Sequence, residues 1–282
     1  GIRLVEHPED LEAAITAAKQ EALNFFGNDE VYMEKFIVNP KHIEVQILAD
    51  SYGNTVYLGE RDCSMQRRNQ KVLEETPSPI MTPELRAKMG KAAVAAAKAC
   101  GYTNAGTIEF LVDADRNFYF MEMNTRIQVE HPITEAVTGI DLVKQQILIA
   151  NGEKLPFAQE DITIRGHAIE CRINAENPAL NFRPSPGQIT ALHIPGGPGI
   201  RVDSSAYQGY TIPPYYDSMI AKLIVHAPTR EEAIAKMKWA LAEFIVDGVD
   251  TNIDFQLSLI RDSLFEKGTY DIGYLGRKLS GK

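Results

Sequence analysis

The sequence predicts an α+β fold, because runs of alternating polar and apolar residues, typical of strands, are interspersed with segments that carry helix start and stop signals. The strongest alternation covers residues 121–132, where every second side chain is polar and would lie on one face of a strand. A second β-rich run covers 106–112, and the intervening residues 113–117 have turn chemistry. The two runs therefore predict an antiparallel hairpin.

The polar face of this hairpin has the composition of a divalent-cation site. With a four-residue turn, Glu109 lies opposite Glu122, and like charges that face each other across strands repel. A cation held by Glu109, Glu122 and Asn124 would compensate them, and these oxygen donors favour magnesium or manganese over zinc. A turn one residue longer would offset the pair, and a solvated sheet face is the plain alternative. The polar face continues with Arg126, Gln128 and Glu130, and the packing face with Met121, Met123, Ile127 and Val129.

The remaining elements follow from local signals along the chain. The predicted helices share capping residues or acidic first turns and begin at or just after Glu9, Thr82, Asp141, Thr229 and Asn252. The predicted strands share short β-rich patterns and cover 31–38, 42–50, 55–60, 164–173, 187–192, 200–202 and 215–225. Pro- and Gly-rich turns separate the strands beyond residue 162, so we place the boundary of a second region at 161/162.

Four cations stand close together in an otherwise acidic chain. Arg61, Arg67, Arg68 and Lys71 have hydrogen-bonding neighbours, which favours a loop that binds an anion as much as it favours solvated surface charge. The net charge of −9 gives no basic footprint for nucleic acid or an anionic membrane. No apolar run approaches the roughly 18 residues of a transmembrane helix. We therefore expect neither nucleic acid nor a membrane as a partner.

The three cysteines and the first residues indicate a cellular compartment. Cys63, Cys100 and Cys171 lack metal-ligand or redox spacing, which favours buried free thiols in a reducing cytoplasm. The first residues lack the features of a signal peptide, and the chain opens without a methionine. We expect a cytoplasmic protein and a piece of a longer chain.

Beyond these local patterns, the chain resembles the ATP-grasp core of biotin carboxylases over essentially its whole length. The resemblance rests on Glu109, Glu122-x-Asn124 and the runs 126–132, 33–36, 60–71 and 165–176. It implies an ATP-grasp domain over residues 1–161, of which 1–37 are the remainder of a lid subdomain, and a biotin carboxylase C-terminal domain over 162–282. The glycine-rich lid loop and the ATP-phosphate lysines of the family are not in this sequence.

The resemblance also implies roles for individual residues. The ATP contacts that it implies are Glu34, Lys35, Phe36, Ile37, His42, Gln66, Asn69, Glu109, Glu122 and Ile272. The family commonly has histidine where this chain has Asn69, and an asparagine amide can still hydrogen-bond a ribose hydroxyl. Bicarbonate would be held by Lys71, Arg126, Gln128 and the Val129 backbone. Glu130 would be the general base for bicarbonate, and Arg172 would stabilise the biotin enolate, unless it pairs with Glu170 or Glu176.

The implied activity is the first half-reaction of a bacterial acetyl-CoA carboxylase in fatty acid synthesis. MgATP activates bicarbonate as carboxyphosphate, which carboxylates biotin on a biotin carboxyl carrier protein, with carboxyltransferase subunits as further partners and a homodimer as the assembly. Three alternatives stay open: the biotin carboxylase part of a propionyl-CoA or pyruvate carboxylase, another ATP-grasp carboxylate ligase, and a non-catalytic nucleotide-binding or dimerisation fragment. Without its lid, the chain alone is expected to fold but to have negligible carboxylase activity.

Overall fold

The computed structural model describes residues 2–281 and contains two compact units, Gly1–Val38 and Asn39–Lys282. The smaller unit is built on α1 (Leu11–Phe26), which follows the short η1 (Pro8–Asp10) and ends at Gly27 in a left-handed conformation. This helix was predicted. The strand expected over 31–38 is wrong, because no described residue pairs with this segment, and a strand needs a neighbour for its backbone hydrogen bonds.

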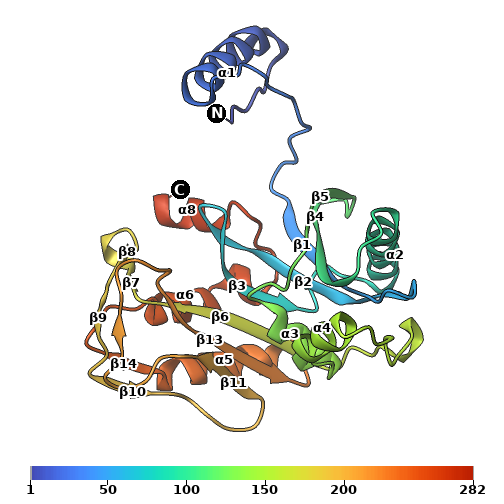
Figure 1. Cartoon of the computed structure of the whole chain (residues 1–282). Helices are drawn as coiled ribbons and strands as arrows, with labels where there is room; N and C mark the ends of the chain where they lie inside the picture. Colours follow the sequence, from blue (N-terminus) through green and yellow to red (C-terminus); the bar gives the residue numbers. More distant parts are fainter. Residues whose placement is uncertain (1, 282) are drawn as a thin grey trace. The chain divides into compact units, whose positions relative to one another are not determined.

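The larger unit is organised around one eight-stranded sheet in the order β11-β13-β6-β3-β2-β1-β4-β5 (Figure 1). All neighbouring pairs are antiparallel. Its strands are β1 (Lys41–Ala49), β2 (Thr55–Arg67), β3 (Gln70–Thr76), β4 (Asn104–Val112), β5 (Phe118–Asn124), β6 (His167–Asn174), β11 (Ile200–Ser204) and β13 (Met219–Ala227). With the helices below, the sheet confirms the predicted α+β class.

Short strands and helices surround this sheet. The small paired strands are β7 (Glu176–Asn177) with β8 (Arg183–Pro184), β9 (Gly187–Gln188) with β12 (Thr211–Ile212), and β10 (Ala191–His193) with β14 (Ile245–Asp247). The helices are α2 (Pro83–Ala99), α3 (His131–Thr138), α4 (Leu142–Ala150), α5 (Arg230–Glu243), α6 (Ile253–Ile260), α7 (Ser263–Glu266) and α8 (Tyr274–Ser280), with the 3-10 turns η2 (Gln159–Asp161) and η3 (Pro178–Leu180).

The predicted caps Thr82, Asp141 and Thr229 are confirmed, since each side chain accepts a backbone hydrogen bond from the first turn of its helix. No described helix is long and apolar enough to cross a membrane.

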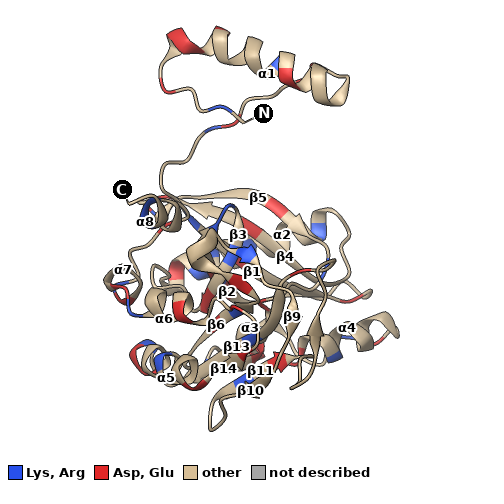
Figure 2. Ribbon diagram, turned by 90° about the vertical axis from the view of Figure 1, so that its left-hand side faces the viewer, with Lys and Arg blue, Asp and Glu red and all other residues tan. Residues whose placement is uncertain are grey.

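The two faces of the sheet differ in what covers them. One face is apolar and packs on α2 through side chains such as Ile43, and on α5 and α6 through side chains such as Leu223. The other face packs on α3 and α4 through Ile133 and Leu142 near its margins. At its centre, charged side chains take the place of the apolar core, and red and blue segments lie close together on the central strands in Figure 2. This polar centre holds the candidate site.

The β4–β5 hairpin brings Glu109 opposite Glu122, but by a different route from the one expected. The last pair before the turn is Val112 with Phe118, so the turn has one residue more than the four expected. A register shift between Glu109 and Phe110 restores the opposition, because Met121 is an extra, bulged residue. Met121 is 40% exposed, so its expected place on the packing face is wrong.

The predicted strand through residues 121–132 is too long. β5 ends at Asn124, and the chain then turns so that Pro132 can occupy the first turn of α3. Glu130 has φ −80° and ψ 7°, which is not an extended conformation. Residues 126, 128 and 130 therefore do not continue a strand face, although two of them are buried next to it.

The predicted basic loop is instead the β2–β3 hairpin. Arg61 lies within β2 and is completely buried, and Lys71 is the second residue of β3. Between the strands, Arg68 and Asn69 both have positive φ, 50° and 63°, which makes a tight turn of the kind that matches the twist of paired strands. The loop prediction failed because a two-residue turn without glycine has a weak sequence signal.

Smaller differences concern strand ends, one cysteine and the domain boundary. The strand predicted over 215–225 begins only at Met219, and the one over 187–192 is broken into β9 and β10. All three cysteines are free, but Cys100 is exposed at the C-terminus of α2. The predicted boundary at 161/162 stays a prediction; the large sheet contains strands from both sides of it.

Candidate active site

Lys71 is at the centre of the polar cluster. Its ammonium nitrogen lies 2.5 Å from Glu44 Oε2, 2.6 Å from Glu130 Oε1 and 3.0 Å from Glu109 Oε1. These carboxylates come from β1, the residue before α3, and β4, so the strand order of the sheet gathers them. Burial by itself would lower the pKa of Lys71, but Glu44, Glu130 and Glu109 raise it well above its usual range. Lys71 therefore stays charged.

Arg61 supports the cluster from inside the protein. Its Nε donates to Glu44 Oε1 at 2.5 Å, and its Nη2 donates to Gln128 Oε1 at 3.1 Å. Its Nη1 bonds Gln46 and Thr134, so Arg61 ties β2 to β1 and α3. Sequence reasoning missed this role because it placed Arg61 in a basic loop, either one that binds an anion or one with solvated surface charge, rather than in a buried strand.

Glu44 is the second buried residue whose role the sequence did not reveal. It lies between Arg61 and Lys71 and is completely buried. Burial would raise the pKa of Glu44, but the two cations lower it to about 2. The available signal was the polar–apolar alternation of β1, which places Glu44 on the same face as His42, two positions earlier.

Glu130 is shared by two cations. Its Oε1 accepts a hydrogen bond from Lys71, and its Oε2 lies 3.1 Å from Nη2 of Arg172 on β6. Arg172 does not pair with Glu170 or Glu176, as the simplest alternative had it. Its Nε instead donates to Glu74 Oε1 on β3 at 2.7 Å. The structure thus brings Lys71, Glu130 and Arg172 together, although they are far apart in the sequence.

The hairpin residues form the second part of the cluster. The Asn124 side-chain nitrogen donates to Glu109 Oε1 at 3.0 Å and to Glu122 Oε1 at 3.1 Å. Glu109 is buried and Glu122 is exposed. Burial would raise the pKa of Glu109, but His42 and Lys71 hold it well below its usual range. Two carboxylates and one amide therefore converge, as the sequence predicted.

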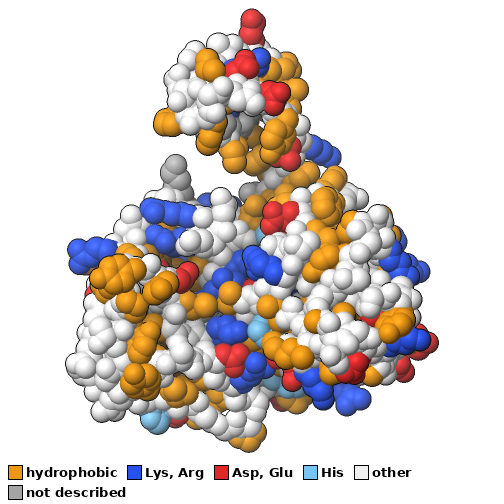
Figure 3. Space-filling view, viewed as in Figure 1, with side chains coloured by type: hydrophobic (Ala, Val, Ile, Leu, Met, Phe, Trp, Pro, Cys, Tyr) orange, Lys and Arg blue, Asp and Glu red, His pale blue; other side chains and the backbone are white. Residues whose placement is uncertain are grey.

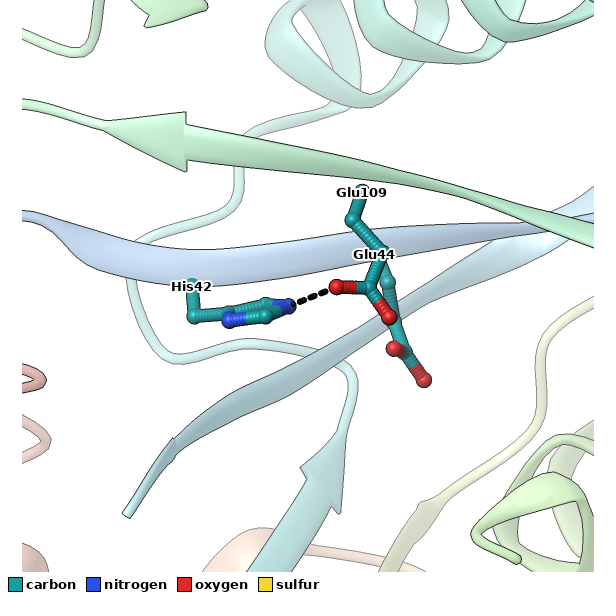
Figure 4. Close-up of side chains that lie close together, drawn as sticks. All are labelled: His42, Glu44 and Glu109. Atoms are coloured by element: carbon teal, nitrogen blue, oxygen red, sulfur yellow. Dashed lines mark ion pairs between the residues drawn. The ribbon is translucent and has the colours of Figure 1, made fainter. Parts of the chain in front are cut away.

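His42 links Glu109 to Gln66. Its Nε2 is 2.8 Å from Glu109 Oε2 (Figure 4). Its Nδ1 is 2.8 Å from the side-chain nitrogen of Gln66. Because that amide nitrogen is a donor, Nδ1 accepts and the ring proton is on Nε2. His42 and Glu44 project from β1 on the same side, and Glu109 reaches them from β4.

The hairpin residues fit a hard divalent cation. Their donor atoms are carboxylate and amide oxygens, which magnesium and manganese prefer. Rotation of the Asn124 amide about its last bond places the side-chain oxygen where the nitrogen now faces Glu109 and Glu122. Glu122 is exposed, so a cation can reach it from solvent. Among the described residues, His42, Glu44 and Glu109 form another buried group with potential metal-ligand atoms near one another. This group has only Glu109 in common with the set Glu109, Glu122 and Asn124.

The other predicted anion ligands are Gln128, Val129 and Arg126, and each has a different partner. Gln128 donates to Glu109 Oε1 at 2.7 Å and is buried. The Val129 carbonyl accepts a hydrogen bond from Lys222 at 2.9 Å, and Lys222 is a cation that sequence reasoning missed. Arg126 is exposed and donates to Asn124 Oδ1 at 3.1 Å, so in this structure it contacts a hairpin residue.

The predicted nucleotide contacts are distributed over several segments. Asn69 is exposed at the β2–β3 turn, and Ile272 is half-buried where its N–H donates to the Pro40 carbonyl. The four hinge residues Glu34, Lys35, Phe36 and Ile37 belong to the smaller unit, and their contacts stay predictions. In the space-filling view, Lys and Arg side chains gather in the middle of the larger unit's face (Figure 3).

A small depression of about 30 Å³ adjoins the central cations and includes Lys71 and Arg172 in its lining. Among the described residues, no hydrogen bond is made by the Arg172 Nη1 nitrogen, whereas Nε and Nη2 are both engaged. The cluster can therefore present cationic nitrogen atoms to an anion while buried carboxylates hold the same side chains in place.

Comparisons with known proteins give two family matches that together cover most of the chain. Residues 1–158 match the family described as carbamoyl-phosphate synthase L chain, ATP binding domain, and residues 170–277 match the biotin carboxylase C-terminal domain. Among curated proteins, biotin carboxylase 1 of Bacillus subtilis (strain 168) is 58% identical over 276 residues, which are 98% of this chain and 61% of that protein.

Solved structures give the same result. The biotin carboxylase domain of a thermophilic 2-oxoglutarate carboxylase, bound to bicarbonate, is 51% identical with a TM-score of 0.95, and the match covers 98% of this chain and 62% of that one. The corresponding domain dimer of the Hydrogenobacter thermophilus enzyme, in complex with MgADP, ADP and bicarbonate, is 51% identical with a TM-score of 0.90, covering 98% and 61%. The chain thus spans about three fifths of the length of these relatives.

Proposed function

The chain belongs to the biotin carboxylase family, and from this premise we propose that it supplies most of the catalytic site of an enzyme that carboxylates biotin with MgATP and bicarbonate. The observation that supports this most directly is the sharing of Glu130 by Lys71 and Arg172. A carboxylate between two cations is an arrangement in which an anionic substrate can replace one ion pair and meet a base.

The hairpin side of the site would serve phosphoryl transfer. Glu109, Glu122 and Asn124 would hold magnesium, or manganese, with ATP. The metal neutralises charge on the phosphate oxygens while phosphorus is attacked. His42 and Gln66 would contact the ribose and phosphates, with Asn69 beside them. The hinge residues of the smaller unit and Ile272 would hold adenine, as the family resemblance implies.

The Lys71 side would bind and deprotonate bicarbonate. Lys71, Arg126, Gln128 and the Val129 N–H would hold the anion next to Glu130. As a bicarbonate oxygen attacks the terminal phosphorus of ATP, the bicarbonate proton passes to Glu130, and the products are carboxyphosphate and ADP. In this structure Lys71 donates a hydrogen bond to Glu130 Oε1, so bicarbonate has to displace Glu130 from Lys71 in order to bind there. The displaced Glu130 oxygen can then accept the bicarbonate proton.

Arg172 would act in the second step. When biotin loses its ureido proton, negative charge develops on the ureido oxygen, and a guanidinium at that position stabilises it. The free Nη1 nitrogen of Arg172, beside the depression that also adjoins Lys71, supports this role.

The finer biological assignment is also a proposal. We propose the acetyl-CoA carboxylase of fatty acid synthesis as the parent enzyme, in the cytoplasm, with a biotin carboxyl carrier protein and carboxyltransferase subunits as partners. The name of the Bacillus subtilis relative supports biotin carboxylation in general, and the family resemblance implies this particular parent enzyme, whereas a similar domain belongs to a 2-oxoglutarate carboxylase. A homodimer is proposed because the Hydrogenobacter thermophilus relative is described as a domain dimer.

The proposed function can be tested in a chimera in which these 282 residues replace the matching part of Bacillus subtilis biotin carboxylase 1. We expect biotin carboxylation that requires ATP, bicarbonate and magnesium. The chain alone should be folded and essentially inactive. A chimera that folds and binds ATP but does not carboxylate biotin would refute the assignment.

The metal assignment has its own test in the same chimera. Glu122→Gln keeps the size of the side chain and removes one charge from the cation site, so more magnesium should be needed for half-maximal ATP cleavage. Arg201→Gln is the matched control, because Arg201 forms its ion pairs with Asp203 and Glu135 outside the cluster. An unchanged magnesium dependence in Glu122→Gln would eliminate this residue as a ligand.

A further inference from the structure

Glu74 and Glu170 form a buried carboxyl pair that the proposed mechanism does not use. They are direct cross-strand partners on β3 and β6, and both are completely buried. Glu74 Oε1 accepts from Arg172, but Glu74 Oε2 and both oxygens of Glu170 have no hydrogen-bond partner among the described residues. Buried polar atoms without partners are rare, so this pair requires a physical explanation.

The surrounding charges do not compensate two ionised carboxylates. The charged groups that face Glu170 are Glu74 on β3, Lys222 on β13, Arg172 on β6 and Glu130 before α3. Arg172 already serves Glu74 and Glu130. Lys222 lies 3.4 Å from Asp203 and donates to the Val129 carbonyl. No cation of the described residues is left for Glu170.

We propose that Glu170 is protonated and that the resulting Glu74–Glu170 pair, with one negative charge, positions Arg172 for the biotin step. The positioning role rests on the proposed function, whereas the protonation does not. Burial first, and Glu74 next, raise the pKa of Glu170 well above its ordinary value, although Lys222 and Arg172 oppose the shift. The proton lets Glu170 donate to the unpartnered Oε2 of Glu74 across the strands by a small side-chain rotation.

The single charge matters because Glu74, Glu170 and Glu130 surround the same guanidinium. Glu170 and Arg172 are two residues apart on β6 and project from the same face. An ionised Glu170 would compete with Glu74 for Arg172 and draw it away from Glu130. With Glu170 neutral, Glu74 binds the Nε and Nη2 nitrogens at 2.7 Å and leaves Nη1 for a ligand.

The protonation can be measured on the chain itself by infrared spectroscopy. A buried carboxylic acid gives a carbonyl band that is separate from the bands of ionised carboxylates. We expect this band in the unmodified chain at neutral pH, its loss at alkaline pH, and its absence from Glu170→Gln. Glu135→Gln is the control and should keep the band, since Glu135 pairs with Arg201. Absence of the band at neutral pH, or its persistence in Glu170→Gln, would overturn the proposal.

The positioning role can be measured in the chimera. Glu74→Gln should reduce kcat for biotin carboxylation roughly 10- to 100-fold, because Arg172 loses its charged anchor, and should leave bicarbonate-dependent ATP cleavage much less affected. Glu170→Gln, which imitates the protonated acid, should keep kcat at neutral pH and resist the alkaline loss that the unmodified chimera shows. A purely structural role would not produce this split.

The outcomes separate the two proposals. If Glu170→Gln loses biotin carboxylation at neutral pH, the site requires a negative charge at Glu170 and the inference is wrong. If Glu74→Gln reduces both partial reactions equally, the pair does not act through Arg172. If the unmodified chimera does not carboxylate biotin, the proposed function fails and the positioning role fails with it, whereas the infrared band still decides whether Glu170 is protonated.

Discussion

Glu74 and Glu75 are neighbours on β3 and are equally buried, yet they face opposite sides of the sheet and have opposite electrostatic surroundings. Glu75 Oε2 lies 2.7 Å from Arg230 Nε and 2.7 Å from His167 Nε2, and its Oε1 accepts a hydrogen bond from Tyr270 at 2.7 Å. Burial would raise the pKa of Glu75, but His167 and Arg230 lower it to about 2. Burial raises the pKa of Glu74, and the shared Arg172 does not reverse this effect.

The difference shows how two buried ionic networks serve different purposes. On the α5 side, each oxygen of Glu75 has a hydrogen-bond or ion-pair partner. Arg230 also donates to the carbonyls of Phe265 and Glu266, so this network holds the C-terminal segment against the sheet. On the α3 side, carboxylates outnumber the cations that hold them, and Lys71 and Arg172 are each shared. Shared cations can exchange a protein carboxylate for a substrate anion, and saturated ones cannot.

The largest expected change in the free energy of unfolding comes from a substitution in the network of Glu75, Arg230, His167 and Tyr270. Glu75→Gln keeps the side-chain shape but leaves Arg230 without its buried counter-charge, so the free energy of unfolding should fall by roughly 3–5 kcal/mol. Urea denaturation of the chain measures it. The control Glu135→Gln, at a partly exposed ion pair with Arg201, should cost less than about 1 kcal/mol. Equal losses in the two variants would show that the Glu75 network is not a structural centre.

The second effect concerns acid pH. The folded-state pKa values of Glu75 and Glu44 lie near 2, below the unfolded value, so the folded chain binds fewer protons between these limits. Stability from these groups is therefore complete above about pH 4.5 and is lost as the pH falls toward 2, by about 3 kcal/mol for each group. Urea midpoints between pH 6 and pH 3 measure this, and a flat profile would contradict the pairing.

The smallest expected change in the free energy of unfolding comes from a substitution of Glu170, on the α3 side of the sheet. Glu170→Gln should change the free energy of unfolding by less than about 1 kcal/mol at about pH 4 or below, where the acid is largely neutral in both the folded and the unfolded chain. The folded-state pKa of Glu170 is raised, so the wild-type folded chain retains a proton that the unfolded chain releases above about pH 4.3. This group thus makes wild-type stability decline as the pH rises beyond that value, and the variant should lack this decline. A loss as large as in Glu75→Gln would remove the contrast between the two faces.

Local patterns predicted much of the fold. Alternation located β1 and most of β5, and the caps Thr82, Asp141 and Thr229 located three helices. Local patterns could not predict the bulge at Met121, because a bulge depends on the partner strand. They also could not show that the chain leaves the sheet after Asn124, since that turn is set by packing of α3.

The candidate site was predictable as a set of residues but not as a set of contacts. The resemblance supplied Lys71, Glu130 and Arg172. Their pairing depends on the order β6-β3-β2-β1-β4, which brings together side chains far apart in sequence. The supporting residues Arg61 and Glu74 were missed for the same reason, because only the sheet register shows which cation each buried carboxylate meets.

The central claim is that Lys71 and Arg172 share Glu130 because the two cations serve successive steps. The most direct test compares Glu130→Gln with Arg172→Gln in the chimera, measuring bicarbonate-dependent ATP cleavage and biotin carboxylation side by side. Glu130→Gln should lose both reactions by roughly 100-fold or more while still binding ATP, because bicarbonate lacks its base. Arg172→Gln should lose biotin carboxylation and retain most of the ATP cleavage. Normal turnover in Glu130→Gln, or loss of the same step in both variants, would contradict the account.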